Sequence, residues 1–414
     1  MQNNLNYKSL IIIHNIQEFA IIKNLIKGMM AMEVYLDNSA TTRVRKEVIK
    51  KMAEVLDKEY GNPSSLHMKG YQAEKLMKEA RENVANLINS EPEGIVFTSG
   101  GTESNNLALI GVAESLKKKG NHIISSKIEH PSVLNVLKYL EENGFEVTYL
   151  DVDKTGKVDV EDLKRAITNK TILISIMAVN NELGTIEPIE EIADIAENKD
   201  IVFHVDAIQA VGKINIDVKK HKIKMVSLSS HKIHGPKGVG ALYIDKSVKI
   251  RPIIFGGGQE KNLRSGTENM PGIVGFGVAS KLAKENFHGN VSKLMTLKKR
   301  LYQGIVSEIK DVHLNGPNVE EGAPHILNIS FAGVRGEVLL HALEEKGIYV
   351  STGSACSSKK KGQSHVLKAI GLKEDLIESA IRFSIGIFNT EEEIDYTISV
   401  LKEKVNFLRK YKRR

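Results

Sequence analysis

Along the middle of the chain, the pattern of apolar and polar residues alternates between segments that predict strands and segments that predict helices. Short runs rich in Ile, Val and Leu, namely HIISS, EVTYLDV, TILISIMAV, IVFHV and MVSLS, predict strands. Between them, PSVLNVLKYLEENG, VEDLKRAI and IEEIADIAEN carry apolar residues three or four positions apart, which predicts amphipathic helices. This alternation predicts an α/β fold with a mostly parallel sheet covered on both faces.

Polar side chains follow several of these strands. His130 comes after HIISSKIE, Asn181 after ILISIMAV, Asp206 after IVFHV, and Lys232 soon after MVSLS. Ligands of a parallel α/β sheet bind beyond the carboxyl ends of its strands. All four residues therefore stand where a ligand is expected.

A glycine turn precedes one of the helices, in IVFTSGGTESNNLALIGVA. Gly100 and Gly101 let the backbone approach a ligand closely, and Thr102 stands at the expected N-cap. Free N–H groups and the helix dipole at such a position favour a phosphate group. Ordinary packing also explains many glycine turns, so the turn alone leaves a phosphate site as one of two readings.

Lys232 and Asp206 together predict a cofactor. The lysine stands directly after a strand, in Ser-Ser-His-Lys with Gly235 and Pro236 close behind, so rigid backbone holds it. Such an amine can be desolvated, its pKa lowered, and used to form a Schiff base. Pyridoxal phosphate needs a lysine for its aldehyde and a carboxylate for its ring nitrogen. Most lysines are solvated surface residues, so the prediction depends on the pair.

Five segments in order, SGGTESNN, HVDAIQ, SSHKIHGPKG, RSGT and SAC, resemble the cysteine desulfurases of the NifS/IscS type, pyridoxal phosphate enzymes of the class-V aminotransferase family. The resemblance covers about residues 32–401. It implies the fold-type I architecture of aspartate aminotransferase, with a mostly parallel seven-stranded sheet in a large domain and a smaller α+β C-terminal domain. We expect the large domain over 45–288 and the small domain over 32–44 together with 289–414. The boundary falls at Phe287–Asn290, where turn-forming residues interrupt two helical patterns.

The resemblance also implies the reaction and the roles of individual residues. L-cysteine would become L-alanine, and its sulfur would remain on Cys356 as a persulfide. Lys232 matches the Schiff-base lysine and proton shuttle, and Arg382 in IRFSIG matches the arginine that grips the substrate carboxylate. Thr267 in RSGTEN matches a threonine contributed by a second subunit, which implies a homodimer. The other matches are His130 stacked on the ring, Asp206 at its nitrogen, Asn181 and Gln209 near its phenolic oxygen with Asn181 also near the substrate, and Gly101, Thr102, Ser229 and His231 in the phosphate cradle.

Cys356 lies in STGSACSSKKKGQSHVLKAIG, among small and hydroxyl residues and before Lys359–Lys361. This composition predicts an exposed, electropositive loop in which a reactive thiolate is favoured, although a lone cysteine is more often a buried apolar residue. We expect a sulfur acceptor, such as an iron–sulfur scaffold protein, to dock near this loop. The sulfur would serve iron–sulfur cluster assembly or the thiolation of tRNA or cofactors. The three lysines leave the acceptor open.

Two other functions stay open at this point. A selenocysteine lyase, or another fold-type I pyridoxal phosphate enzyme, would not need Cys356. A non-enzymatic scaffold on the same fold would be expected to lose the lysine, the aspartate or the phosphate residues, and all are present here. One departure from the family is Ile387 after Gly386, where many members carry a second arginine.

Composition narrows the setting. A single cysteine in 414 residues excludes an internal disulfide framework and fits a reducing, cytoplasmic location. The net charge of +7 would allow contact with nucleic acid or an acidic protein. Aromatic and basic residues do not interleave, however, so a lysine-rich solvated surface is favoured over a nucleic-acid site. No apolar run reaches the length of about 18 residues that a membrane span requires. His231, His234 and His204 lack an evident third ligand, so we expect no metal site.

The first thirty or so residues lack the charged start, clean apolar core and cleavage site of a signal peptide. We expect residues 1–31 to be an extension, with Met29, Met30 or Met32 as the natural start. The mass of the intact native protein would test this expectation.

Overall fold

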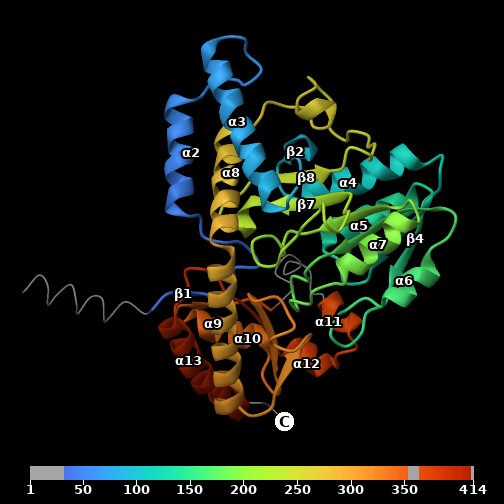
Figure 1. The fold of residues 1–414 in the computed structure, drawn as a ribbon. Helices are drawn as coiled ribbons and strands as arrows, with labels where there is room; N and C mark the ends of the chain where they lie inside the picture. The colour runs from blue at the N-terminus through green and yellow to red at the C-terminus, as the bar shows by residue number, and fades with distance from the viewer. Residues whose placement is uncertain (1–31, 353–362, 412–414) are drawn as a thin grey trace, which may run out of the picture.

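The computed structural model describes residues 32–352 and 363–411, and the expected extension over 1–31 lies outside them. Its largest element is a seven-stranded sheet in the order β2-β8-β7-β6-β5-β3-β4 (Figure 1). β8 runs antiparallel to both of its neighbours, and the other neighbouring pairs are parallel. The strands are β2 (Ile95–Thr98), β3 (His122–Ser126), β4 (Glu146–Leu150), β5 (Thr171–Met177), β6 (Val202–Asp206), β7 (Met225–Ser229) and β8 (Gly240–Ile244).

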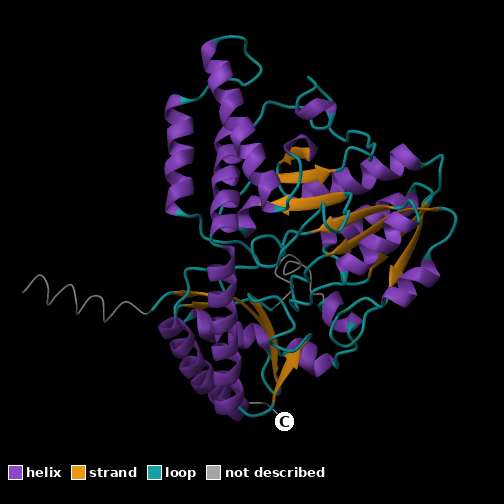
Figure 2. Cartoon of the chain, in the orientation of Figure 1, coloured by secondary structure: helices purple, strands orange, loops and turns teal. Residues whose placement is uncertain are grey.

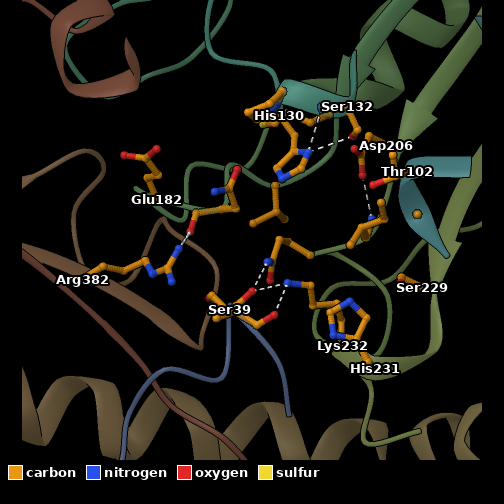
Figure 3. A pocket seen from close by; sticks show the side chains of 18 of the residues that line it. Ser39, Thr102, His130, Ser132, Glu182, Asp206, Ser229, His231, Lys232 and Arg382 are labelled. Carbon is orange, nitrogen blue, oxygen red and sulfur yellow. Dashed lines mark hydrogen bonds between the residues drawn. The ribbon is translucent and has the colours of Figure 1, made fainter. Parts of the chain in front are cut away.

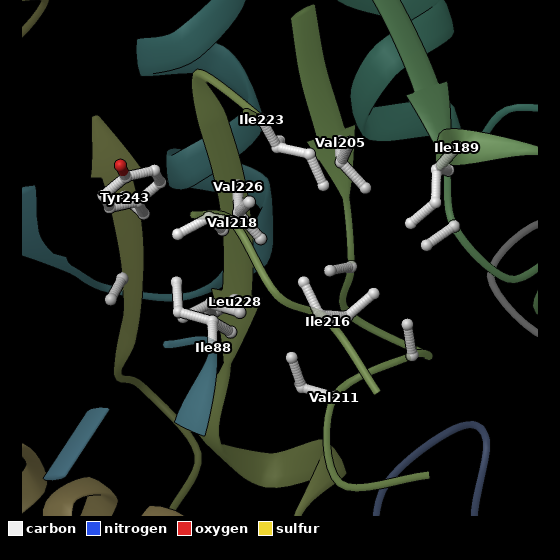
Figure 4. Close-up of a cluster of buried hydrophobic side chains, with 14 of the residues drawn as sticks. Ile88, Ile189, Val205, Val211, Ile216, Val218, Ile223, Val226, Leu228 and Tyr243 are labelled. Atoms are coloured by element: carbon white, nitrogen blue, oxygen red, sulfur yellow. The ribbon is translucent and has the colours of Figure 1, made fainter. Parts of the chain in front are cut away.

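Helices cover both faces of this sheet because neighbouring residues of a strand point to opposite faces. Leu173 of β5 packs with α4 (Gly101–Leu116) and α5 (Pro131–Glu142) in one apolar core. Ile174, the next residue, packs in the other core, to which α7 contributes. Figure 4 shows part of this second core, where Val205 of β6 lies on the same face of the sheet as Val226 and Leu228 of β7. The helices on this second side are α7 (Ile189–Asn198), α2 (Lys46–Lys58), α3 (Met68–Leu87) and α8 (Met270–Glu285), and α6 (Val160–Ala166) links β4 to β5.

A smaller body follows α8, with a three-stranded antiparallel sheet in the order β12-β10-β9 (Figure 2). It has its own apolar core, and Val34 and Leu36 from the start of the described chain belong to it. Two separate cores support the expected division into a large and a small domain, which stays a prediction. The elements are β1 (Val34–Tyr35), which pairs in parallel with β11 (Ile348–Tyr349), β9 (Val312–Asn315), β10 (Ile326–Phe331), β12 (Ala380–Ser384), α9 (Phe287–Glu308), α10 (Gly336–Glu344), α11 (His365–Ala369), α12 (Glu374–Glu378) and α13 (Glu391–Lys410).

The turn expected at Phe287–Asn290 is wrong. These residues form the first turn of α9, and Asn286 alone separates α9 from α8. The N–H of Asn290 donates to Asn286 O at 2.9 Å, as in a continuing helix. A glycine inside a helix costs about 1 kcal/mol. The stripe of Leu294, Leu297, Leu301 and Ile305 that α9 buries outweighs this cost.

Among the described helices, none is long and apolar enough to cross a bilayer. The same part of the chain holds no group of three or more His, Cys, Asp or Glu side chains that could hold a metal ion.

Glu187, which precedes α7, makes the stability of the fold depend on pH. Its side chain is 3% exposed, one oxygen accepts from the N–H of Val158 at 3.0 Å, and burial raises its pKa from 4.5 to about 8. Between these values the folded protein keeps a proton that the unfolded chain has lost. The free energy of unfolding therefore falls as the pH rises through this window.

We expect Glu187→Gln, which resembles the protonated acid, to remove this dependence. The variant should exceed the parent in free energy of unfolding by on the order of 4 kcal/mol at about pH 8, and match it below about pH 4. Urea unfolding at both pH values measures the difference. Glu191→Gln, at an exposed position of α7, serves as the control. Equal pH dependence in both variants would contradict the prediction.

Candidate active site

A cavity of about 340 Å³ opens at the carboxyl ends of β5, β6 and β7 (Figure 3). Two segments distant in sequence close it: the turn after β1 and the strand β12 of the smaller body. Most of the residues predicted to form the site line this one cavity. They are Gly101, Thr102, His130, Asn181, Asp206, Gln209, Ser229, His231, Lys232 and Arg382.

One predicted residue lies elsewhere, and another lies outside the described residues. Thr267 does not line the cavity, and its side chain is exposed in the segment between the 3-10 turn at Glu260–Asn262 and α8. Cys356 lies outside the described residues.

Lys232 ends the 3-10 turn Ser230–Lys232, which follows β7 directly. Its Nζ donates to Ala40 O at 2.9 Å and also to Ser39 O, so two main-chain carbonyls from the turn after β1 hold the amine (Figure 3). Behind it, the buried Lys213 donates from Nζ to Lys232 O at 2.8 Å. Burial, assisted by the charge of Lys232, lowers the pKa of Lys213 to about 7. Hydrogen bonds thus hold Lys232 both at its main-chain carbonyl and at its side-chain amine.

Asp206, at the end of β6, is 5% exposed and accepts two hydrogen bonds. Oδ1 accepts from the N–H of Ile208 at 3.0 Å, and Oδ2 accepts from Asn105 Nδ2 at 2.8 Å. N–H donors stabilise a buried carboxylate in its ionised form. The side chain can therefore present a negative charge to a ring nitrogen in the cavity.

His130 is the N-cap of α5, and its hydrogen bonds decide which nitrogen carries the proton. Nδ1 accepts from the N–H of Ser132 at 3.1 Å and lies 2.8 Å from Ser132 Oγ. Because Asn105 Nδ2 donates to Ser132 Oγ at 2.9 Å, the hydroxyl is free to donate its own hydrogen to Nδ1. Burial lowers the pKa of His130, with Lys232 adding to the effect. The ring is therefore neutral, with its hydrogen on Nε2.

The N-terminus of α4 forms a cradle with the end of β7. A Cβ on Gly101 would lie 2.1 Å from Ile208 Cδ1, so a larger residue there would force the side chain of Ile208 to move. Thr102 and Ser229 line the same corner, and the buried Ser229 Oγ meets no hydrogen-bond partner within residues 32–352 and 363–411. His231 is neutral, since burial and the charge of Lys232 lower its pKa to about 4. An unsatisfied hydroxyl beside a helix N-terminus suits a phosphate group.

Arg382 reaches the cavity from β12 and is 3% exposed. One terminal nitrogen donates to Asp37 Oδ1 at 2.7 Å, and the other donates to Asn181 O at 3.0 Å. The buried Nε has no partner among the described residues. Asn181 thus orients the guanidinium through its main-chain carbonyl, a contact that a prediction based on side chains does not include.

Several lining or supporting residues escaped the sequence-based prediction. Asn105 lies one helical turn after Thr102 and so on the same face of α4, a signal already present in SGGTESNN. Glu182 lines the cavity, and its Oε2 lies 2.5 Å from Ser364 Oγ. Asp37 and Ser39 come from the turn after β1, and the residues around them do not indicate that this turn contributes to a site at the end of β7.

The cavity thus offers a lysine amine, a buried carboxylate and an anion cradle, and these donors and acceptors fit pyridoxal phosphate. Lys232 would hold its aldehyde, Asp206 its ring nitrogen, and the Gly101–Thr102 turn with Ser229 its phosphate. A family model described as aminotransferase class-V matches residues 34–397. The chain belongs to the class-V aminotransferase family.

Curated relatives extend this result. A protein named cysteine desulfurase IscS from Clostridium botulinum (strain Hall) is 50% identical over 373 residues, which span 90% of this chain and 94% of the relative. A protein of the same name from Methanosarcina thermophila is 48% identical over 376 residues, or 91% of this chain and 93% of that relative.

Solved structures agree with this family. A NifS-like protein superposes with a TM-score of 0.86 at 42% identity, covering 91% of this chain and all of the other. A structure titled SspA in complex with cysteine has a TM-score of 0.76 at 38% identity, covering 86% of this chain and 100% of that one. The predicted family, the α/β fold with a mostly parallel sheet, and the predicted dependence on pyridoxal phosphate are confirmed.

Proposed function

We propose that this class-V enzyme is a cysteine desulfurase that converts L-cysteine to L-alanine and transfers the sulfur to Cys356 as a persulfide. The observation that carries the proposal is the meeting of Lys232, Asp206 and Arg382 in one cavity. The identity of 50% to a cysteine desulfurase over nine-tenths of this chain bears out the activity itself. The roles of the individual residues are part of the proposal.

The residues of the cavity have separate roles in the reaction. Bound pyridoxal phosphate supplies an electron sink for the pair left when the substrate Cα loses its proton. Arg382 binds the substrate carboxylate and orients it, with Asp37 and Asn181 O fixing the guanidinium. Lys232 holds the cofactor, then takes the proton from Cα and returns it. His130, neutral and protonated on Nε2, would lie against the ring of the bound cofactor, with that nitrogen available as a donor.

Sulfur transfer needs a thiolate, and Cys356 is the only cysteine of the chain. Its sulfur attacks the sulfur of the substrate, and an S–S bond forms. The Cβ–S bond of the substrate breaks, and its electron pair stays on Cβ, which takes up a proton. The products are alanine and a persulfide on Cys356, so no external oxidant or reductant is required.

The test is incubation of the purified, pyridoxal-phosphate-loaded enzyme with L-cysteine. We expect alanine in equal amount to a one-sulfur mass increase on the peptide that carries Cys356, and neither product in Cys356→Ser. Alanine formation that survives in Cys356→Ser would point to a lyase that releases sulfur or selenium directly. A loaded enzyme that forms no alanine would overturn the substrate.

Arg382→Lys tests the substrate carboxylate site. Lysine keeps the positive charge but loses the planar fork that binds a carboxylate through two parallel hydrogen bonds. We expect KM for L-cysteine to rise by about 10- to 100-fold with a smaller change in kcat, which steady-state alanine assays measure. Arg335→Lys, at an exposed position, is the control. An unchanged KM would remove Arg382 from substrate binding.

We also infer a homodimer with shared sites. Large apolar side chains are exposed on the α2–α3 connection and on the segment before α8: Leu66 is fully exposed, Tyr60 is 73% exposed and Phe255 is 81% exposed. Such residues are typical of a surface that a partner covers. Thr267 is exposed in the connection between β8 and α8, which also carries Phe255, as a residue donated to the site of a second copy would be. Light scattering should give a mass in solution of twice that of the chain. The double variant with Leu66→Asp and Phe255→Asp should have the mass of a single chain.

The partner that accepts the sulfur is proposed to be a protein that docks near Cys356, such as an iron–sulfur scaffold. A cytoplasmic location is also proposed, because one cysteine in 414 residues suits a reducing compartment.

A further inference from the structure

His325 is a buried imidazole beside the active site that the proposed reaction does not use. It immediately precedes β10 in the smaller body, and it is 0% exposed. Its Nε2 lies 3.3 Å from Oε1 of Gln209, a residue that lines the cavity. Its Nδ1 meets no partner among the described residues. This contact joins the smaller body directly to a side chain of the cofactor site.

The neighbours of Gln209 decide the orientation of its amide. Gln209 Nε2 lies 2.9 Å from Ser39 O, which is a carbonyl and can only accept. The NH₂ group of Gln209 must therefore face Ser39, and the amide oxygen must face His325. It follows that His325 carries its hydrogen on Nε2 and donates it to Gln209 Oε1. Ser39 O also accepts from Lys232 Nζ, so the same carbonyl contacts both residues.

Burial and the surrounding charges keep His325 neutral. Lys213, Lys298, Arg382 and Lys232 face it from the surrounding elements, and burial with these four cations lowers its pKa well below the ordinary value. A neutral ring has one hydrogen, and Gln209 Oε1 takes it. This hydrogen bond fixes the tautomer of the neutral ring.

We propose that His325 is a positioning residue that locks the amide of Gln209, so that the second N–H of that amide stays available as a donor to a ligand in the cavity. The inference rests on the proposed function, in which that ligand is pyridoxal phosphate and the acceptor is its phenolic oxygen. Without His325 the amide oxygen of Gln209 would be a buried acceptor lacking its donor. The amide would then turn and compete for other donors.

A donor to the phenolic oxygen has an observable effect on the lysine-bound cofactor. It stabilises the negative charge of that oxygen, which in turn weakens the hold on the proton of the nitrogen that joins lysine to the cofactor. Loss of the donor should raise the pH at which this proton leaves. The absorbance of the bound cofactor changes at that step, so a pH titration reads it without turnover.

The experiment compares the holoenzyme with His325→Leu, His325→Gln, Gln209→Leu and the double leucine variant. We expect the absorbance transition of His325→Leu to move up by about one pH unit. In His325→Gln the new amide nitrogen can stand where Nε2 stood, so its transition should stay at the parent value. The double variant should match Gln209→Leu alone, because His325 acts only through Gln209.

Three results would overturn the proposal. One is a transition that moves in Gln209→Leu but not in His325→Leu. Another is an additional shift in the double variant. The third comes from the cofactor-free parent protein, where ¹⁵N NMR of the histidines should find His325 protonated on Nε2, and protonation on Nδ1 would exclude the contact even if His325→Leu fails to fold. A parent protein that binds no cofactor would instead refute the proposed function, while the NMR result would still decide the contact.

Discussion

Lys232→Ala should abolish alanine formation from L-cysteine. The amine of this residue stands on a rigid turn after β7, where Ser39 O and Ala40 O hold its tip and Lys213 contacts its carbonyl. Loss of the amine removes both the covalent hold on the cofactor and the base at Cα. We expect a decrease of at least about a thousandfold in kcat, because a group that forms the covalent intermediate has no substitute in the site.

The measurement is alanine released under saturating L-cysteine and pyridoxal phosphate. Lys246→Ala, an exposed lysine after β8, should retain full activity. The cofactor-free forms of both variants should unfold at the temperature of the parent, which separates lost chemistry from a lost fold. A Lys232→Ala enzyme that kept a tenth of the activity would disprove the assignment.

The second large effect concerns stability. Arg81 of α3 and Glu260 form a buried ion pair, with side chains 14% and 3% exposed and the closest nitrogen and oxygen 2.6 Å apart. Arg81 also donates to Ile95 O, and Glu260 also accepts from the N–H of Phe97. Glu260, Lys261 and Asn262 all have a positive φ, of 44°, 60° and 64°. Such backbone persists only where the surroundings fix it, and the ion pair fixes its first residue.

Arg81→Met should therefore lower the free energy of unfolding by about 3–5 kcal/mol, because it leaves the carboxylate of Glu260 buried without its counter-charge. Urea unfolding of the cofactor-free protein measures the loss. Arg81→Met combined with Glu260→Gln should recover most of it, since the uncompensated charge is then gone. A double variant as unstable as Arg81→Met would show that the charge is not the cause. The same loss in Arg300→Met, which breaks an exposed ion pair, would contradict the prediction too.

Local patterns were sufficient to predict most of the fold and the polar residues at the strand ends. α7, β3 and β7 begin and end where the apolar periodicity places them. The pattern failed at Phe287–Asn290, where turn-forming residues become helical because the buried stripe further along α9 decides the conformation. Propensity is a weak prior against packing of that extent.

Contacts between distant segments could not be predicted from the order of the residues. Asp37 meets Arg382, Arg81 meets Glu260, and Gln209 meets His325 only after the whole fold has formed. Asn181 illustrates a different limit, since it orients Arg382 by a main-chain carbonyl that any residue would supply. The loop character predicted around Cys356 stays a prediction, because that cysteine lies outside the described residues.

The pairing of β1 has a consequence for biosynthesis. β1 and the residues after it lie against β11 and β12, with Leu36 N donating to Tyr349 O and Ser384 N donating to Leu36 O. A ribosome completes β12 more than three hundred residues after β1. The large sheet can form on the nascent chain before then, since domains tend to fold as they emerge. Arg382 of β12 lines the cofactor cavity, so this wall of the cavity is missing until the end of the chain has been made. The cofactor pocket is therefore completed only late in synthesis.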